Sequence, residues 1–235
     1  MERRVGLASQ LHRWTEMPAP GRLLRICEVL APAVVIGSAQ DRDEIDAARL
    51  HASGTGLVRR RSGGGAVFVS PASQLWIDFF VPRRDRFFES DVGRSFDWVG
   101  NAWACAIRRA LGADGAVSVV ERGSQGDGAF GRSLCFVQVV RGEVTLDGRK
   151  VVGCSERRDR GGAWIHTMAG LEPTFDKLAF LLATSARRRR EAARALAAGS
   201  TVLPGGSACA GGVVSALLGV LAAPGPVIDG GVLYP

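Results

Sequence analysis

The sequence of 235 residues predicts an α+β fold in which helices flank a mixed, mostly antiparallel β-sheet. Short apolar segments follow one another through glycine-containing turns, as hairpin-connected strands do. Residues 91–111, by contrast, repeat apolar side chains every three or four positions, which is typical of a helix. Because neither a repeat nor a long linker interrupts the chain, we expect residues 1–235 to form a single domain.

The first half of the chain is expected to begin with a short helix or arm over residues 1–20. Helical spacing and early acidic residues predict a helix over residues 42–52. Four apolar segments are predicted to be strands: residues 33–37, 56–58, 66–69 and 75–81.

The second half opens with the helix over residues 91–111, which has Asp91 at its start and Arg108 and Arg109 at its end, as the helix dipole favours. Asp147-Gly148 predicts a type I′ turn between two strands of a hairpin. The strands expected here cover residues 117–120, 134–140, 143–146, 150–152 and 163–168. Further helices are expected over residues 175–183, 188–198 and 211–221.

The charge of the chain favours an anionic partner. Its formal net charge is +7 and its isoelectric point is about 9.9. Aromatic residues make up only 7%, with a single tyrosine, so a surface for stacking nucleic-acid bases is unlikely on composition. Lys150 and Lys177 are the only lysines among the 30 basic residues, which draws attention to the lysine that lies within a motif, Lys150.

Cysteine usage argues against a disulfide framework and a zinc site, because the cysteines are scattered and form no CxxC pair. They are Cys27, Cys105, Cys135, Cys154 and Cys209. The N-terminus has no apolar signal segment, and the longest apolar run, residues 211–223, is too short to span a bilayer. We therefore expect a cytoplasmic protein that does not associate with a membrane and whose side chains form no metal site.

The glycine-rich segment Arg-Arg-Arg-Ser-Gly-Gly-Gly at residues 59–65 is suited to holding an anion against bare backbone. Glycines permit tight turns and close approach of a ligand, and successive backbone N–H groups can point at an anion. Arginine adds a fork that binds carboxylate or phosphate. The segment lies between two strands, whereas a P-loop or a dinucleotide fingerprint would lead into a helix, so both are disfavoured.

Two motifs resemble those of a known family. RRRSGGGAV at residues 59–67 resembles the acyl-binding loop of the biotin/lipoate protein ligase superfamily, and GRKVVGCSERRDRGGAWIHTMAG at residues 148–170 is similar to the segment that carries its essential lysine. Over about residues 33–169 the chain is similar to the lipoate–protein ligase A and octanoyltransferase family. The resemblance implies the biotin/lipoate ligase-like catalytic domain, without the C-terminal accessory domain of larger ligases.

The activity that this resemblance implies is transfer of a lipoyl or octanoyl group, through an acyl-adenylate, to a lysine of a lipoyl domain. The cofactors would be ATP and Mg²⁺. The proteins that accept the acyl group would be acidic lipoyl-domain proteins, either 2-oxoacid dehydrogenase E2 or the glycine cleavage H protein. Lys150 would be catalytic, as a compact cation where carboxylate meets phosphate. The implied substrate-binding residues are Arg60, Ser62, Gly63, Gly64, Gly65, Ala66, Val67, Gly153, Ser155 and His166.

Departures from the ligase pattern keep two alternatives open. Val69 stands where the ligases often have histidine, and Ser133-Leu134 stands where they have an Asn-Asp pair. Cys135-Phe136 instead resembles the Cys-Phe pair of cysteine-dependent octanoyltransferases, which implies Cys135 as the nucleophile, an acyl carrier protein as donor and no ATP. The other alternative is a non-catalytic module that binds acyl groups or an acidic protein, with Cys135 and His166 as ordinary buried strand residues.

Overall fold

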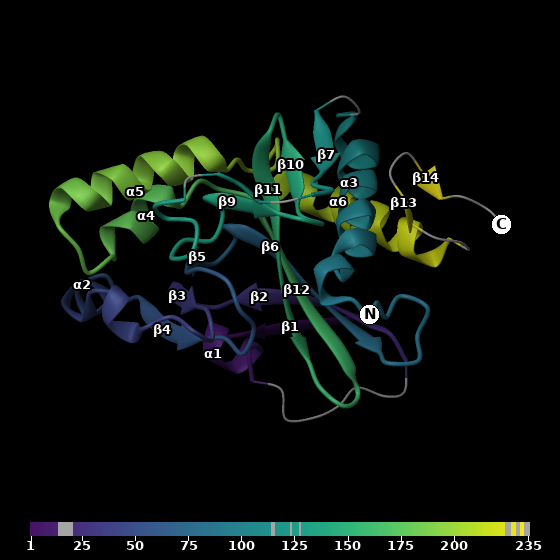
Figure 1. The fold of residues 1–235 in the computed structure, drawn as a ribbon, viewed down its shortest axis with the longest axis horizontal. Helices are drawn as coiled ribbons and strands as arrows, with labels where there is room; N and C mark the ends of the chain where they lie inside the picture. Colours follow the sequence, from purple (N-terminus) through teal and green to yellow (C-terminus); the bar gives the residue numbers. More distant parts are fainter. Residues whose placement is uncertain are drawn as a thin grey trace.

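The computed structural model describes residues 1–13, 21–113, 116–122, 124–126, 128–223, 227–228 and 231–232. Its centre is a seven-stranded sheet, seen along the middle of Figure 1. In spatial order the strands are β1 (Glu2–Gly6), β2 (Leu23–Val29), β6 (Gln74–Pro82), β12 (Gly162–Gly170), β11 (Arg149–Arg158), β10 (Val144–Leu146) and β7 (Val117–Val119). Among the described strands of this sheet, β1 and β2 pair in parallel and all other neighbours pair antiparallel, so the predicted mixed, mostly antiparallel sheet is confirmed.

A second, three-stranded sheet carries the glycine-rich segment. Its central strand, β3 (Ala33–Ile36), pairs in parallel with β4 (Gly56–Arg59) and antiparallel with β5 (Val67–Val69). The glycines therefore connect β4 to β5 by crossing over the end of β3. Two short pairs complete the described strands: β8 (Ser124–Gly126) with β9 (Gln138–Val140), and β13 (Val227–Ile228) with β14 (Gly231–Val232).

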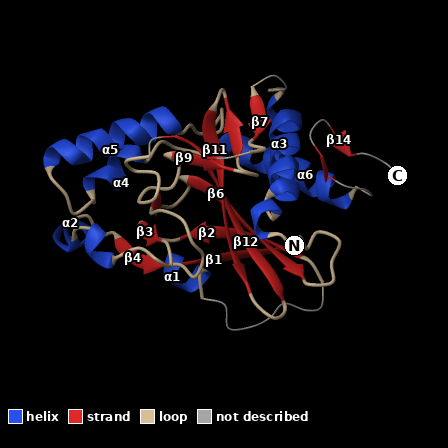
Figure 2. Cartoon of the chain, in the orientation of Figure 1, coloured by secondary structure: helices blue, strands red, loops and turns tan. Residues whose placement is uncertain are grey.

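Helices cover the sheets on opposite sides of the molecule (Figures 1 and 2). The long helices α3 (Asp97–Leu111) and α6 (Ser207–Ala222) bury apolar side chains such as Trp103 and Leu217 in one core with the large sheet. At the other end, α4 (Phe175–Phe180) and α5 (Ala186–Gly199) share a core with the small sheet. The remaining short helices are α1 (Ala8–Leu11), α2 (Ala47–Ala52) and two 3₁₀ turns, Arg42–Glu44 and Val92–Arg94.

The N-terminal expectation was incomplete and one predicted helix was too long. The chain begins with strand β1, and β2 was missed because Arg25 and Glu28 interrupt its apolar pattern. The helix expected over residues 42–52 is divided, because Ile45 is extended and pairs with Leu182. Only residues 47–52 form an α-helix, which the side chain of Asp46 caps.

The hairpin around Asp147-Gly148 is confirmed, since both residues have positive φ, 51° and 72°, as a type I′ turn requires. The strand expected over residues 134–140 is shorter, because Phe136 has a φ of 73° and the regular strand starts only at Gln138. Leu134 and Cys135 form isolated bridges with Ala66 and Gln138, residues 136–137 form a turn, and the Cys135 side chain lies beside Lys150 at the start of β11.

Candidate functional site

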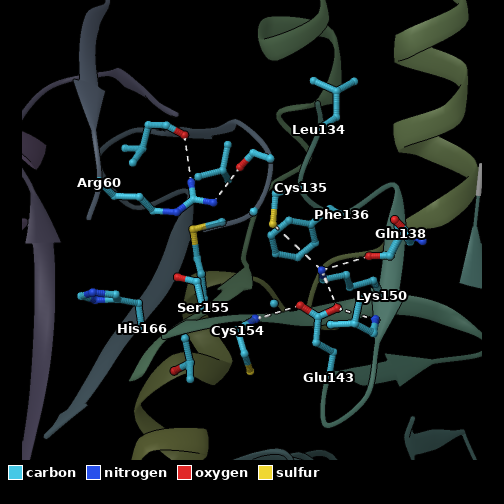
Figure 3. Close-up of a pocket in the computed structure, with 18 of the residues that line it drawn as sticks. Arg60, Leu134, Cys135, Phe136, Gln138, Glu143, Lys150, Cys154, Ser155 and His166 are labelled. Atoms are coloured by element: carbon cyan, nitrogen blue, oxygen red, sulfur yellow. Dashed lines mark hydrogen bonds and ion pairs between the residues drawn. The ribbon is translucent and has the colours of Figure 1, made fainter. Parts of the chain in front are cut away.

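A cavity of about 150 Å³ lies where the two sheets meet, and most of the sequence motifs converge on it (Figure 3). Its walls come from the glycine-rich segment and β5, from residues 131–140, from the first half of β11, and from β12. His12 and Trp76 line another part of it. The surroundings are mainly apolar, so charged groups in the cavity interact more strongly than they would in water.

Cys135 and Lys150 lie together in this cavity. The Lys150 ammonium Nζ is 4.0 Å from the Cys135 thiol Sγ and donates a hydrogen bond of 3.1 Å to the backbone carbonyl of Gln138. It also lies 5.2 Å from the centre of the Phe136 ring. Lys150 is only 3% exposed, so its charge is buried. Gly153 leaves room for it, because a Cβ there would stand 3.1 Å from Lys150 Cε.

The Lys150 charge is balanced by Glu143, which is 2% exposed. One carboxylate oxygen, Oε2, lies 2.7 Å from Lys150 Nζ and accepts the Val140 N–H at 3.0 Å. The other, Oε1, accepts the Cys154 N–H at 3.0 Å. Sequence reasoning missed Glu143, because a register irregularity between Val144 and Thr145 pairs Val144 with Val152 and so brings Glu143 close to Cys154, which a regular two-residue hairpin does not predict.

Two neighbours of Cys135 in the cavity, Lys150 and Cys154, have shifted pKa values. Burial by itself lowers the pKa of Lys150, but the charges of Cys135 and Glu143 outweigh burial and hold that pKa above its usual value. Burial and the neighbouring Glu143 carboxylate raise the pKa of Cys154 well above the ordinary range, so Cys154 stays a neutral thiol. Lys150 is therefore an ammonium beside Cys135.

Arg60 holds the glycine-rich segment in shape. Its guanidinium donates hydrogen bonds to the carbonyls of Val35 (3.2 Å), Gly63 (2.7 and 3.1 Å) and Gly65 (2.9 Å). Burial lowers the pKa of Arg60, yet a guanidinium keeps its charge at neutral pH. In this structure the Arg60 N–H groups therefore donate to backbone carbonyls. The family resemblance implies that Arg60 also contacts substrate, and that contact would have to use the same N–H groups.

The predicted substrate-binding residues divide into two groups. Those that line the cavity are Arg60, Gly64, Gly65, Val67, Gly153, Ser155 and His166, whereas Ser62, Gly63 and Ala66 do not. Two members of the second group bond to residues that line the cavity. The Ser62 and Ser155 hydroxyls are 2.9 Å apart, and the Ala66 carbonyl accepts the Cys135 N–H at 2.9 Å. The glycine-rich segment is therefore bonded directly to the turn that carries Cys135.

Gly65 is required by this contact. A Cβ at Gly65 would lie 2.6 Å from the carbonyl carbon of Leu134 and 2.7 Å from the Cys135 nitrogen, both backbone atoms. Gly65→Ala is expected to push the two segments apart, with a loss of unfolding free energy of about 1–3 kcal/mol and a misplaced Cys135. Chemical denaturation and an acyl-transfer assay would measure both effects.

Gly63→Ala is the matched control, because nothing lies within 4 Å of a Cβ at Gly63. The control should stay close to the unchanged protein in both measurements. Equal behaviour of the Gly65 and Gly63 variants would contradict the need for close backbone contact at Gly65.

His166 belongs to a separate buried network. Its Nδ1 lies 2.8 Å from Asp78 Oδ1, which also accepts the Trp76 indole N–H at 2.6 Å. Burial raises the pKa of Asp78, but the charge and hydrogen bond of His166 bring it below its usual value, so Asp78 is a carboxylate. Burial lowers the pKa of His12 to about 3, with a smaller contribution from the nearby His166. Figure 3 places His166 on the opposite side of the cavity from Lys150 and Glu143.

Two further properties concern the part of the chain that the structure describes. No group of three or more His, Cys, Asp or Glu side chains in it is arranged to hold a metal ion. None of its helices has both the length and the apolar character needed to cross a bilayer.

Comparison with known families decides the relationship. The profile of the lipoyl protein ligase A/B catalytic domain matches residues 3–203. The chain belongs to this family. It is accordingly an enzyme of the ligase and acyltransferase class with a lipoyl protein ligase catalytic domain. No curated protein sequence matched the chain.

Solved structures of the family share its fold. A bipartite lipoate protein ligase from Thermoplasma acidophilum, studied with its E2 lipoyl domain, is 16% identical, with a TM-score of 0.61 over 93% of this chain and 81% of the other. A lipoate–protein ligase A bound with ATP is 16% identical, with a TM-score of 0.55 over 95% and 97% of the two chains. A putative lipoate protein ligase from T. acidophilum with bound lipoic acid is 17% identical, with a TM-score of 0.55 over 94% and 95%.

Proposed function

We propose that this enzyme transfers an octanoyl or lipoyl group from a thioester donor to a lysine of a lipoyl domain, through a thioester on Cys135. The observation that carries the proposal is the position of the Cys135 thiol, in the cavity and 4.0 Å from an ammonium that is itself held by a buried carboxylate. A thiolate is the reactive form of cysteine, and a neighbouring cation stabilises it.

The reaction proceeds in two acyl transfers. The Cys135 thiolate attacks the carbonyl carbon of the donor thioester, and the donor thiol leaves as its thiolate. The neutral amine of the acceptor lysine then attacks the Cys135 thioester, a C–N bond forms, and the C–S bond to Cys135 breaks. The attacking nitrogen loses one proton to water, Cys135 leaves as its thiolate, and the donor thiolate released in the first transfer takes up one proton from water, so that the products are an amide and the donor thiol.

Lys150 is suited to stabilise the negative charge in both transfers. Its ammonium lies beside the sulfur, where the thiolate and then the oxyanion of each tetrahedral intermediate carry charge. A fixed cation in an apolar cavity provides this stabilisation without reorganisation during the reaction. Lysine is the appropriate cation, because a guanidinium is larger and planar and would not occupy the space beside Gly153 in the same way.

The partners are proposed from relatives and charge. The T. acidophilum ligase was studied with its E2 lipoyl domain, which supports an E2 lipoyl domain, such as that of a 2-oxoacid dehydrogenase, as acceptor. The glycine cleavage H protein is proposed as a second acceptor from the family resemblance alone. The net charge of +7 would attract acidic lipoyl domains and an acidic acyl carrier protein as donor. All five cysteines are free, which suits the reducing cytoplasm. We propose that residues 1–235 act as one catalytic domain.

An ATP-dependent ligase is the second candidate, because a lipoate–protein ligase A of the same fold was solved with ATP bound. In that case Lys150 would neutralise charge at the adenylation step. The cavity fits this route less well. Among the described residues that line the cavity, Arg60 and Lys150 are the arginine and lysine side chains, and both are engaged, on backbone carbonyls and on Glu143. Phosphate groups would have to displace these contacts.

Intact-protein mass spectrometry of a lipoyl domain separates the candidates. The domain is incubated with the enzyme and either octanoyl-acyl carrier protein, or free octanoate or lipoate with and without ATP and Mg²⁺. We expect acylation of the domain from the carrier thioester without ATP. Acylation only from free acid with ATP would favour the adenylate route. No acylation in any arm would contradict both and favour a non-catalytic binding module.

A further inference from the structure

An acyl group on Cys135 would lie next to a second nucleophile of the same protein. Lys150 Nζ is 4.0 Å from Cys135 Sγ, and the thioester carbonyl would be attached to that sulfur. A neutral amine so placed reacts rapidly with a thioester, because proximity replaces a bimolecular encounter. The nitrogen would attack the carbonyl carbon, the C–S bond would break, and the sulfur would take the proton that the nitrogen loses. The product is an amide on Lys150, which leaves the enzyme without its cation.

We propose that Glu143 protects the acyl-enzyme by keeping Lys150 protonated, so that the acyl group cannot pass from Cys135 to Lys150. The inference rests on the proposed function, since it requires an acyl group on Cys135. An ammonium has no lone pair and cannot attack a carbonyl carbon. In this view Glu143 acts through Lys150, as a positioning residue that fixes both the place and the protonation of the amine.

The geometry directs the Glu143 carboxylate at Lys150. Its carboxylate is buried, its Oε2 lies 2.7 Å from Lys150 Nζ, and two backbone N–H groups, of Val140 and Cys154, hold it in place. Taking such a carboxylate out of water is costly, and a buried ion pair is weak evidence for stability. A function that needs a permanent ammonium explains why both charges are present inside the cavity.

The need for Glu143 is greatest after acylation. In the free enzyme, negative charge on Cys135 and on Glu143 favours the Lys150 ammonium. Acylation converts the Cys135 sulfur into a thioester, which cannot carry that charge. Among the described residues that line the cavity near Lys150, the titratable side chains are then Glu143 and Cys154, and the buried Cys154 is a neutral thiol. Glu143 thus remains the anion that offsets burial, which by itself favours the neutral amine.

The other charged or titratable groups of the cavity do not replace it. Arg60 is a cation bonded to carbonyls of the glycine-rich segment, and a cation disfavours the ammonium. His12 is neutral, and Figure 3 shows His166 on the far side of the cavity from Lys150. The carbonyl of Gln138 accepts one hydrogen bond from Lys150 but carries no charge.

The test compares acyl-enzymes of Glu143→Gln and the unchanged protein. Both are loaded with S-phenyl thiooctanoate, an activated thioester that acylates cysteine without assistance, in the absence of a lipoyl domain. Samples taken over time at pH 8 are treated with neutral hydroxylamine, which cleaves thioesters and leaves amides, and are weighed by intact mass spectrometry. Peptide mapping locates any resistant octanoyl group. Glu156→Gln is the control, because it removes a carboxylate of β11 that pairs with Arg158 and does not line the cavity.

In the unchanged protein and in Glu156→Gln we expect the adduct on Cys135 to remain labile to hydroxylamine. In Glu143→Gln we expect a resistant octanoyl group on Lys150, formed at least about tenfold faster, because loss of the partner of a buried lysine lowers its pKa and raises the fraction of neutral amine. The double variant Glu143→Gln, Lys150→Met should form no resistant adduct at this position.

Several outcomes would overturn the inference. One is a Glu143→Gln acyl-enzyme that is as labile to hydroxylamine as that of the unchanged protein. If Glu143→Gln does not fold by circular dichroism, Glu143→Asp, which shortens the side chain and weakens the contact with Lys150, should still form the amide several-fold faster than the unchanged protein. Equal rates would then overturn the inference. Absence of any thioester on Cys135 in the unchanged protein would instead reject the proposed function on which it rests.

Discussion

Cys135→Ser is expected to reduce acylation of a lipoyl domain by at least about a thousandfold, as loss of a nucleophile does in enzymes with covalent intermediates. The hydroxyl of serine does not ionise at neutral pH, and the Lys150 ammonium beside it cannot supply a base. The fold should be unaffected, because the Cys135 side chain is only partly buried and serine is of similar size. Initial rates with octanoyl-acyl carrier protein as donor would measure the effect.

Cys154→Ser is the matched control for this prediction. Cys154 lines the same cavity, but its pKa is raised by burial and by Glu143, so it is not a candidate thiolate. The family segment that it occupies often carries serine at this position, and the control should keep most of the activity. Loss of activity in Cys154→Ser together with normal activity in Cys135→Ser would show that the nucleophile was assigned to the wrong cysteine.

Lys150→Ala should lower the rate of acyl transfer by about a hundredfold or more, because the cation that stabilises thiolate and oxyanion is lost. The structure adds a second effect that the sequence did not predict. Glu143 would remain buried without its partner, which is expected to lower the free energy of unfolding by about 3–5 kcal/mol. Initial rates and urea denaturation would measure the two effects separately.

A double variant separates catalysis from stability at this site. Lys150→Met with Glu143→Gln removes both charges and keeps side chains of similar length, so much of the lost stability should return while the activity does not. Recovery of acyl transfer in the double variant would contradict a direct role for the Lys150 ammonium. Lys150→Arg, which keeps the charge in a larger planar group, is expected to remain poorly active.

The sequence predicted much of the fold because its strands and turns have local signals. Asp147-Gly148 specifies its turn through two positive φ angles, and the helix over residues 91–111 follows from apolar spacing, although the structure starts it at Asp97. Strand β2 lacks such a signal, because the buried Arg25 and the exposed Glu28 break its pattern. Its place in the sheet depends on pairing with β1 and β6, which are distant in the chain.

The site was predictable as far as motifs and residue types reach. Lys150, Cys135 and the glycine-rich segment were named from their patterns, and the structure brings them to one cavity. Glu143 and Asp78 were missed, because a carboxylate has no periodicity of its own and its partner is set by sheet register. Asp78 faces His166 only because β6 pairs with β12 in that register. The direction of the Arg60 guanidinium, toward backbone carbonyls, likewise follows from the folded loop.

The most direct test of a Cys135 acyl-enzyme is intact mass spectrometry of the unchanged protein mixed with octanoyl-acyl carrier protein alone, without ATP and without a lipoyl domain. We predict one octanoyl group per molecule, located on Cys135 by peptide mapping, removed by neutral hydroxylamine and transferred to a lipoyl domain when one is added. An enzyme that acylates the lipoyl domain at a normal rate but never carries an octanoyl group on Cys135 would contradict this mechanism.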